Sequence, residues 1–388
     1  MTALALLTGC PTDEEATPSG GSETATAGST GAALTTSTTD VSGSTSDTES
    51  STSDGTSGST SIDPDTGSDS SSTTGNSRSC GMPAELGVTT VGRFDIDGFH
   101  VSQGRMAAAI RGDGVAMLDV SDPAAVSVLG TLDPAGGPTY RAAMRGDLLV
   151  GGRRGGGAFM VDATDPASMT ELWTDGDLDT QDILYGDLLY LASAAGLSVL
   201  DVTTPGTPTT LVDDLQQDNN DLNIGGSTVV MESGALYMAG FSFTSIDVST
   251  PATPTTLADV DDTGRPDNLV AGGGFVYVGG NDGVQIFDVS NPIAPVLVGT
   301  YEGERATLLA LDAENDRLFV FGSSTASTDV PLLRVVDLTD KTNPTEVGSM
   351  YDDLDDPLWA QYDDGTLYFS TDATDPASLY ILEGCPPA

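Results

Sequence analysis

The sequence predicts an all-β fold, a seven-bladed β-propeller preceded by a disordered lipoprotein stalk, and three observations support it. First, a short apolar run that ends in Asp and then Pro recurs along the chain, as in residues 283–292 (GVQIFDVSNP). Second, its copies are spaced by about 40–50 residues, a spacing typical of propeller blades. Third, residues 11–79 are almost entirely Ser, Thr, Gly, Asp, Glu and Ala, a composition that cannot form a core.

Each copy of the pattern is expected to be a strand that stops at a tight turn. Asp, Ser and Asn bond nearby backbone N–H groups, and Pro fixes φ and removes a donor. The turn acids are Asp119, Asp162, Asp201, Asp247, Asp288, Asp337 and Glu383, separated by 43, 39, 46, 41, 49 and 46 residues. Seven copies predict seven blades, and the alternative is a β-sandwich with coincidental Asp-Pro turns. Because the acid recurs in every copy, we assign it to turn chemistry and not to a reaction.

The fifth unit shows how four strands fit into one repeat. We expect an inner strand at 266–271, a second at 275–279, a third at 284–289 and an outer strand at 295–301. Glycine-rich turns, such as 272–274, separate them. Residues 333–337 (LRVVD) resemble the LVIVD repeat, which is found in bacterial surface and secreted proteins. This resemblance covers residues 88–383 and implies a propeller, but it brings no catalytic residues.

The N-terminus resembles the end of a bacterial lipoprotein signal. Residues 1–10 are a short apolar run that ends in Leu-Thr-Gly-Cys, so we expect Cys10 to carry a lipid. The alternative is a short buried helix with an incidental cysteine. The expected organisation is therefore a signal remnant at 1–10, a disordered linker at 11–79 spanning about 45 Å, and the propeller at 80–388. This arrangement would anchor the protein in the bacterial envelope, in the outer membrane or at the cell surface.

The other two cysteines flank the expected ring. Cys80 precedes its first strand, and Cys385 follows its last strand. The first and last blades of a ring are neighbours, and an exported chain meets an oxidising compartment. We therefore expect a Cys80–Cys385 disulfide.

The charge balance restricts the partners. The formal net charge is −45, with 13 Lys and Arg against 58 Asp and Glu, which argues against binding to nucleic acid. Cations or a basic partner match this charge. The alternative is that the acidic residues only keep a surface protein soluble.

Acidic loops precede most of the expected inner strands and would meet at one mouth of the channel. Asp182, Asp221, Asp267 and Asp356 take comparable positions there. Carboxylate oxygens suit Ca²⁺, so these four residues are the candidate metal ligands. The alternatives are solvated loops and a catalytic role.

Other candidate residues are more isolated. His100 is the single histidine, and we expect a structural role on an inner strand. Arg153 and Arg154, in the glycine-rich loop 151–157, could pair with the acidic mouth or hold an anion. Trp173 and Trp359 are expected to pack the ring, with glycan stacking as the alternative.

These observations favour a non-enzymatic, monomeric cell-surface lipoprotein whose propeller is a binding or adhesion scaffold. No catalytic constellation is visible, and the partner would be an unidentified protein or glycan. The alternative is a Ca²⁺-dependent hydrolase or lyase acting at the acidic mouth, which would resemble propeller lactonases.

Overall fold

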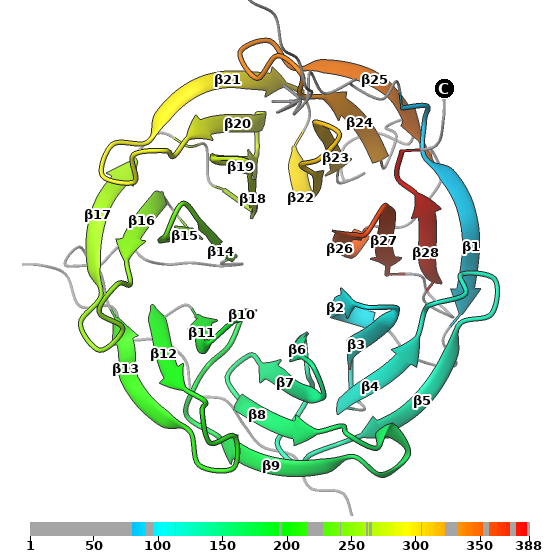
Figure 1. Ribbon diagram of the computed structural model, residues 1–388, viewed down its shortest axis with the longest axis vertical. Coiled ribbons are helices and arrows are strands. Elements are labelled where there is room, and N and C mark those ends of the chain that lie inside the picture. The colour runs from blue at the N-terminus through cyan, green and yellow to red at the C-terminus, as the bar shows by residue number, and fades with distance from the viewer. Residues whose placement is uncertain are drawn as a thin grey trace, which may run out of the picture. The chain divides into compact units, whose positions relative to one another are not determined.

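The computed structural model is a seven-bladed β-propeller, which confirms the fold class (Figure 1). It describes residues 80–90, 96–112, 114–193, 196–215, 228–240, 242–260, 263, 266–303, 305–322, 333–351, 357–372 and 378–385. Within them, 28 strands form seven four-stranded antiparallel sheets, with a single 3₁₀ turn, η1, at Pro166–Ser168. No helix in these ranges has the length and apolar character to cross a bilayer. The expected lipid site at Cys10 and the linker at 11–79 lie outside the described residues.

Each blade runs from an inner strand to an outer strand. Blades one to three are β2(Ile96–Ser102), β3(Arg105–Ile110), β4(Gly114–Asp119) and β5(Ser127–Leu132); β6(Arg141–Arg145), β7(Leu148–Arg153), β8(Gly157–Asp162) and β9(Thr170–Asp175); β10(Asp182–Tyr185), β11(Leu188–Ala192), β12(Leu197–Asp201) and β13(Thr209–Leu215). Blades four to six are β14(Val229–Glu232), β15(Ala235–Ala239), β16(Phe243–Asp247) and β17(Thr255–Val260); β18(Asn268–Gly272), β19(Phe275–Gly280), β20(Gly283–Asp288) and β21(Val296–Glu302); β22(Ala306–Asp312), β23(Arg317–Gly322), β24(Leu333–Asp337) and β25(Thr345–Met350). Blade seven is β26(Pro357–Asp363), β27(Thr366–Thr371), β28(Ser378–Glu383) and β1(Ala84–Thr90).

Blade seven closes the ring with strands from both ends of the propeller. The outer strand β1 pairs antiparallel with β28, so the first strand of the propeller completes the last blade. Cys80 and Cys385 form a disulfide with a Cα–Cα distance of 4.8 Å, which confirms the expected pairing. The Arg317 guanidinium also donates to the Cys80 carbonyl oxygen at 2.6 Å. The closure is thus held by a strand ladder, a covalent bond and a buried arginine.

The recurring Asp turns have one geometry. In six blades the Asp Oδ1 accepts from the backbone N–H of the Ser or Thr two residues later, at 2.8–3.0 Å. These pairs are Asp119–Ser121, Asp162–Thr164, Asp201–Thr203, Asp247–Ser249, Asp288–Ser290 and Asp337–Thr339. For Asp119, the hydroxyl and backbone bonds of Ser121 lower the carboxyl pKa. This confirms that these acids serve turns.

The same turns also lock adjacent blades together. A Cβ added at Gly130 of β5 would lie 1.7 Å from the carbonyl oxygen of Pro166, in the Asp turn of the next blade. Gly299 of β21 gives the equivalent approach, 2.0 Å from the carbonyl oxygen of Lys341. An outer-strand glycine therefore makes room for the neighbouring turn. Deeper in the ring, apolar clusters fill the spaces between blades, such as Met117 of β4 with Phe159 of β8.

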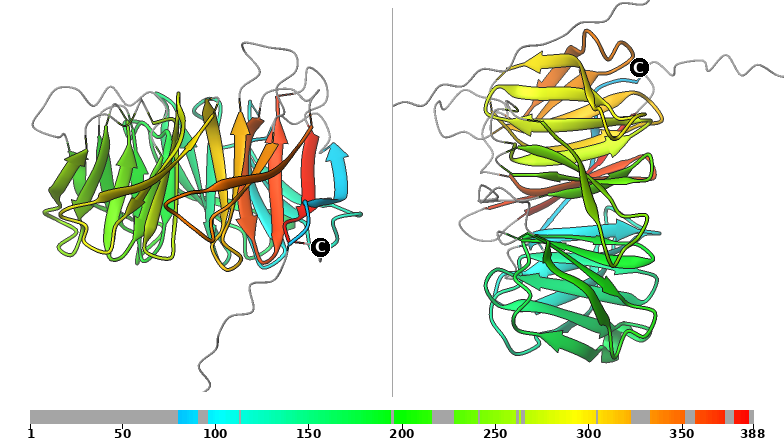
Figure 2. Two further views of the ribbon diagram at one scale, coloured as in Figure 1. Left: turned by 90° about the horizontal axis from the view of Figure 1, so that it is seen from above. Right: turned by 90° about the vertical axis from the view of Figure 1, so that its left-hand side faces the viewer.

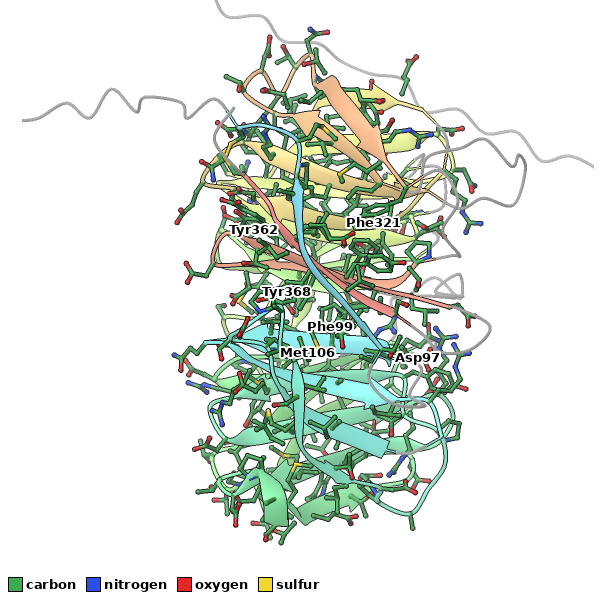
Figure 3. The ribbon with its side chains drawn as sticks, turned by 90° about the vertical axis from the view of Figure 1, so that its right-hand side faces the viewer. Asp97, Phe99, Met106, Phe321, Tyr362 and Tyr368 are labelled. Atoms are coloured by element: carbon green, nitrogen blue, oxygen red, sulfur yellow. A yellow bond between two sulfur atoms is a disulfide. The ribbon has the colours of Figure 1, made fainter. Side chains whose placement is uncertain are left out.

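The strand ends define two faces of the ring (Figure 2). The turn face carries the Asp turns and the short hairpins between the first and second strands of each blade. The entry face is opposite, where each inner strand begins. Figure 3 shows Asp97, near the start of β2, and Tyr362, near the end of β26, towards these opposite faces.

Candidate binding site in the channel

The pairing registers align the seven inner strands and define a collar near the entry face. In six blades, one inner-strand residue is the pairing partner of the fifth residue of the second strand. In blade four the equivalent residue is Thr228, whose carbonyl oxygen accepts from the N–H of Ala239, the fifth residue of β15. The collar comprises Gly98, Arg141, Asp182, Thr228, Asn268, Leu308 and Trp359. These seven residues are of seven types, in contrast to the uniform Asp turns.

Three collar side chains tie one blade to the next. Asp182 Oδ2 accepts from the N–H of Val229 at 2.9 Å. Thr228 Oγ1 accepts from Leu269, and Asn268 Oδ1 accepts from Leu309, at 2.8 and 3.0 Å. Each side chain therefore satisfies a buried backbone donor of the following inner strand, which would otherwise be costly.

Asp182 is an acid held in an apolar setting. It is only 6% exposed, and its Oδ1 also accepts from the N–H of Ile183 at 2.9 Å. Burial raises the pKa of Asp182 to about 6, against the opposing effects of Arg141 and of these backbone bonds. The desolvation cost of the carboxylate therefore exceeds the stabilisation from its partners.

Arg141 lies along the channel wall across three blades. Its Nη1 donates to the carbonyl oxygens of Asp97 in β2 and of Tyr140, at 3.2 and 3.0 Å, and its guanidinium stacks on Trp359 of β26 at 4.2 Å from the ring centroid. Gly98 makes this path possible, since a Cβ there would lie 2.9 Å from Arg141 Cδ. Arg141 Nε is buried without a hydrogen-bond partner, and its approach to Asp182 Oδ1 is 4.0 Å.

Beyond the collar, towards the turn face, the channel contains an open recess of about 300 Å³. Five inner strands line it, β10, β14, β18, β22 and β26, and the lining is apolar except for Gln361 and Tyr362. The apolar lining residues are Leu184, Val230, Met231, Val270, Ala271, Leu309, Ala310, Leu311 and Ala360. The amide of Gln361 is already engaged, accepting from Val101 N–H and donating to Val101 carbonyl oxygen. The recess therefore suits an apolar group.

The expected metal ligands do not gather among the described residues. Asp267 forms a two-pronged ion pair with Arg305, with both N–O distances 2.7 Å, which raises the pKa of that arginine. Asp182 is occupied as described above, and Asp221 and Asp356 lie outside the described residues. Within the described ranges, no group of three or more His, Cys, Asp or Glu side chains could hold a metal ion. The calcium site thus stays a prediction.

A second hollow, of about 440 Å³, lies between blades six and seven. Its lining is strongly acidic and comprises Asp312, Ala313, Glu314, Asn315, Tyr362, Asp363, Asp364, Gly365, Glu383 and Cys385. The lining residues lie at the hairpins of the turn face, whereas the expected acidic mouth belongs to the entry face. Tyr362 hydroxyl donates to Asp312 Oδ2 at 2.5 Å, so one of these acids is part of the blade contact.

The remaining candidates have structural positions. Arg153 is 1% exposed, donates to the Pro134 carbonyl oxygen at 2.9 Å and stacks on Phe159. Arg154 is exposed and lies 5.2 Å from the ring centroid of Tyr140. Burial lowers the pKa of His100, which keeps its imidazole neutral. Trp173 packs on the apolar cluster between blades two and three.

The architecture defines a seven-bladed propeller, and comparisons agree with this fold. Residues 179–212 and 263–303 match the LVIVD repeat. Similar solved structures include a chain of the mitotic checkpoint complex (13% identity, 78% of this chain and 96% of that chain covered, TM-score 0.61) and the computationally designed Ika8 protein (12%, 76%, 99%, 0.53). Saccharomyces cerevisiae Sqt1 is also similar (10%, 75%, 83%, 0.55). At these identities the likeness concerns the fold alone, and no curated protein matches this chain.

Trp359 packs against two apolar clusters of the ring, as expected, but sequence reasoning missed Arg141 and its stacking on Trp359. Neither residue belongs to a motif, and the contact depends on blades two and seven meeting across blade one. One signal was present: Gly98 interrupts an otherwise buried strand, as glycine does where another group approaches closely.

Proposed function

We propose that this protein is a non-enzymatic binding module whose ligand site is the channel. The observation that carries the proposal is the recess, in which five blades present apolar side chains around an open space of about 300 Å³. A volume of this size is at the lower end for small-molecule pockets. The recess suits a small molecule, so the protein or glycan partner expected from the sequence stays a separate prediction.

Several acidic side chains already form hydrogen bonds or ion pairs within the protein, which supports a binding role over a catalytic one. The turn acids hold turns, Asp182 holds Val229, and Asp267 pairs with Arg305. General acid–base chemistry needs a group that is within reach of a substrate and has a suitable pKa. At the entry face, the hydrolase or lyase alternative therefore depends on the expected ligands Asp221 and Asp356, which lie outside the described ranges.

We also propose that the module is displayed on the bacterial surface by a lipid on Cys10. The Cys80–Cys385 disulfide supports export, because such bonds persist in oxidising compartments. The test is metabolic labelling with a fatty acid and membrane fractionation of the wild type and Cys10→Ala. Membrane association and labelling that survive the substitution would contradict the proposal.

The channel site can be tested with octan-1-ol as a neutral apolar probe, by calorimetric titration of the full chain. Met231 lines the recess and is 42% exposed, so Met231→Trp should fill the space without disturbing the core. Val347, on the outer strand β25, is also 42% exposed and gives a matched control, Val347→Trp. We expect saturable binding that Met231→Trp weakens at least tenfold and Val347→Trp leaves unchanged. Absence of binding, or equal effects of the two substitutions, would contradict a channel site.

A further inference from the structure

We propose that the channel ligand is a small anionic amphiphile, an alkyl carboxylate, with its head against Arg141 and its tail in the apolar recess. This inference rests on the proposed channel site and adds the chemical class of the ligand. It depends on the position of Arg141 relative to the recess.

The collar and the recess are adjacent along the same strands. Trp359 directly precedes Ala360, and Asn268 lies two residues before Val270. Two residues of a strand span about 6.6 Å, the length of a few methylene groups. A ligand in the recess therefore ends near the Arg141–Trp359 stack, so a short amphiphile spans both regions.

Arg141 has an unused donor for a carboxylate. Nη1 is taken by two carbonyl oxygens, whereas the buried Nε has no hydrogen-bond partner. Burial is the main cause that lowers the pKa of Arg141, and the charge of the exposed Arg154 acts in the same direction. Two guanidinium groups in one region favour an anion, and Trp359 beneath one of them fixes its plane.

The carboxylates that face Arg141 differ in their availability. Asp97 of β2 is paired with Arg111 through both oxygens, at 2.9 and 2.5 Å. Asp182 of β10 is 4.0 Å from Arg141 Nε and bonded to two backbone donors. Burial lowers the pKa of His100 of β2, which disfavours its charged form, and β26 contributes Trp359 and Gln361, which are uncharged. Asp182 is therefore the carboxylate that competes with a ligand head for Arg141.

The experiment compares octanoate with octan-1-ol, by calorimetric titration at constant ionic strength and pH 7. We expect the wild type to bind octanoate at least tenfold more tightly than octanol. Arg141→Gln should bring the two affinities to parity while octanol still binds, whereas Arg145→Gln, which removes an exposed turn-face ion pair with Asp187, should not. Asp182→Asn, which removes the competing carboxylate beside Arg141, should increase the preference for octanoate.

The outcomes separate the two proposals. Equal affinities in the wild type, or a preference that survives Arg141→Gln, would overturn the carboxylate assignment and leave the channel site in place. Binding of neither compound would overturn both. If Arg141→Gln does not fold, Asp182→Asn decides, because a preference for octanoate that this substitution leaves unchanged contradicts a head group beside Asp182.

Discussion

Asp182 offers a quantitative test of how the collar is built. Burial raises its pKa from an ordinary value of 3.8 to about 6, so the folded state binds this proton more tightly than the unfolded state does. A shift of about two pKa units corresponds to about 3 kcal/mol. This contribution to the free energy of unfolding is fully present below about pH 4 and is lost as the pH rises through 6. The wild type therefore carries a penalty at neutral pH that a neutral side chain avoids.

Asp182→Asn removes that titration and keeps an acceptor for one of the two backbone N–H groups. The assay is urea unfolding of the full chain at several pH values from 4.5 to 7.5. We expect the stability of Asp182→Asn relative to wild type to rise by about 2 kcal/mol across this range, even if the lost hydrogen bond makes it less stable at low pH. Asp187→Asn is the control, because Asp187 is 95% exposed. Parallel pH profiles for wild type and Asp182→Asn would refute the reasoning.

Three further predictions concern the disulfide that closes the ring, the contact between an outer strand and the neighbouring Asp turn, and the effect of divalent cations. Reduction of the disulfide, or Cys385→Ser, should lower the free energy of unfolding by about 5 kcal/mol in the chain-entropy model, since the bond closes a loop with a sequence separation of 305; an unchanged urea midpoint would contradict a role in closure. Gly130→Ala should cost about 1–3 kcal/mol, because its Cβ meets the Pro166 carbonyl, whereas Gly176→Ala has open space around it and should be neutral. Because Asp182 and Asp267 are engaged by Arg141 and Arg305, we expect Ca²⁺ and Mg²⁺ at equal concentration to raise the melting temperature equally. A calcium-selective rise that Asp267→Asn abolishes would instead establish a bound ion.

The repeated parts of the molecule were predictable because they depend on local chemistry. The apolar run, the Asp turn and the spacing predicted seven blades, and in the fifth unit the strand boundaries differ by at most two residues from those observed. The Cys80–Cys385 pairing followed from ring closure and from the oxidising compartment expected for an exported chain. The sequence did not show that Ala84–Thr90 is the outer strand of blade seven, since β1 lacks the Asp motif and pairs with a strand nearly 300 residues away.

The channel could not be predicted because its chemistry depends on contacts between blades. Acidic residues before the inner strands indicated an acidic mouth. Arg141 and Arg305, from other blades, instead engage two of the acids in that group. The recess is apolar because Leu184, Val230 and their counterparts share one height of the channel, which is fixed by registers that a single strand does not reveal.

The contrast between turns and collar indicates where selection for a ligand would act. A ring of repeats needs every blade to present the same turn to its neighbour, and six Asp turns meet that need with one geometry. Stability alone gives no reason for the collar to differ in every blade, because Thr228 and Asn268 show that a simple polar side chain suffices to tie adjacent inner strands. Blade six departs from that solution with Leu308, and blades one, two and seven depart from it together: Gly98 leaves the space that Arg141 fills, and Trp359 provides the surface on which Arg141 stacks. Together, Gly98, Arg141 and Trp359 place one buried guanidinium group next to the apolar recess. Closure of the ring does not require this arrangement, whereas a ligand with an acidic head would use it.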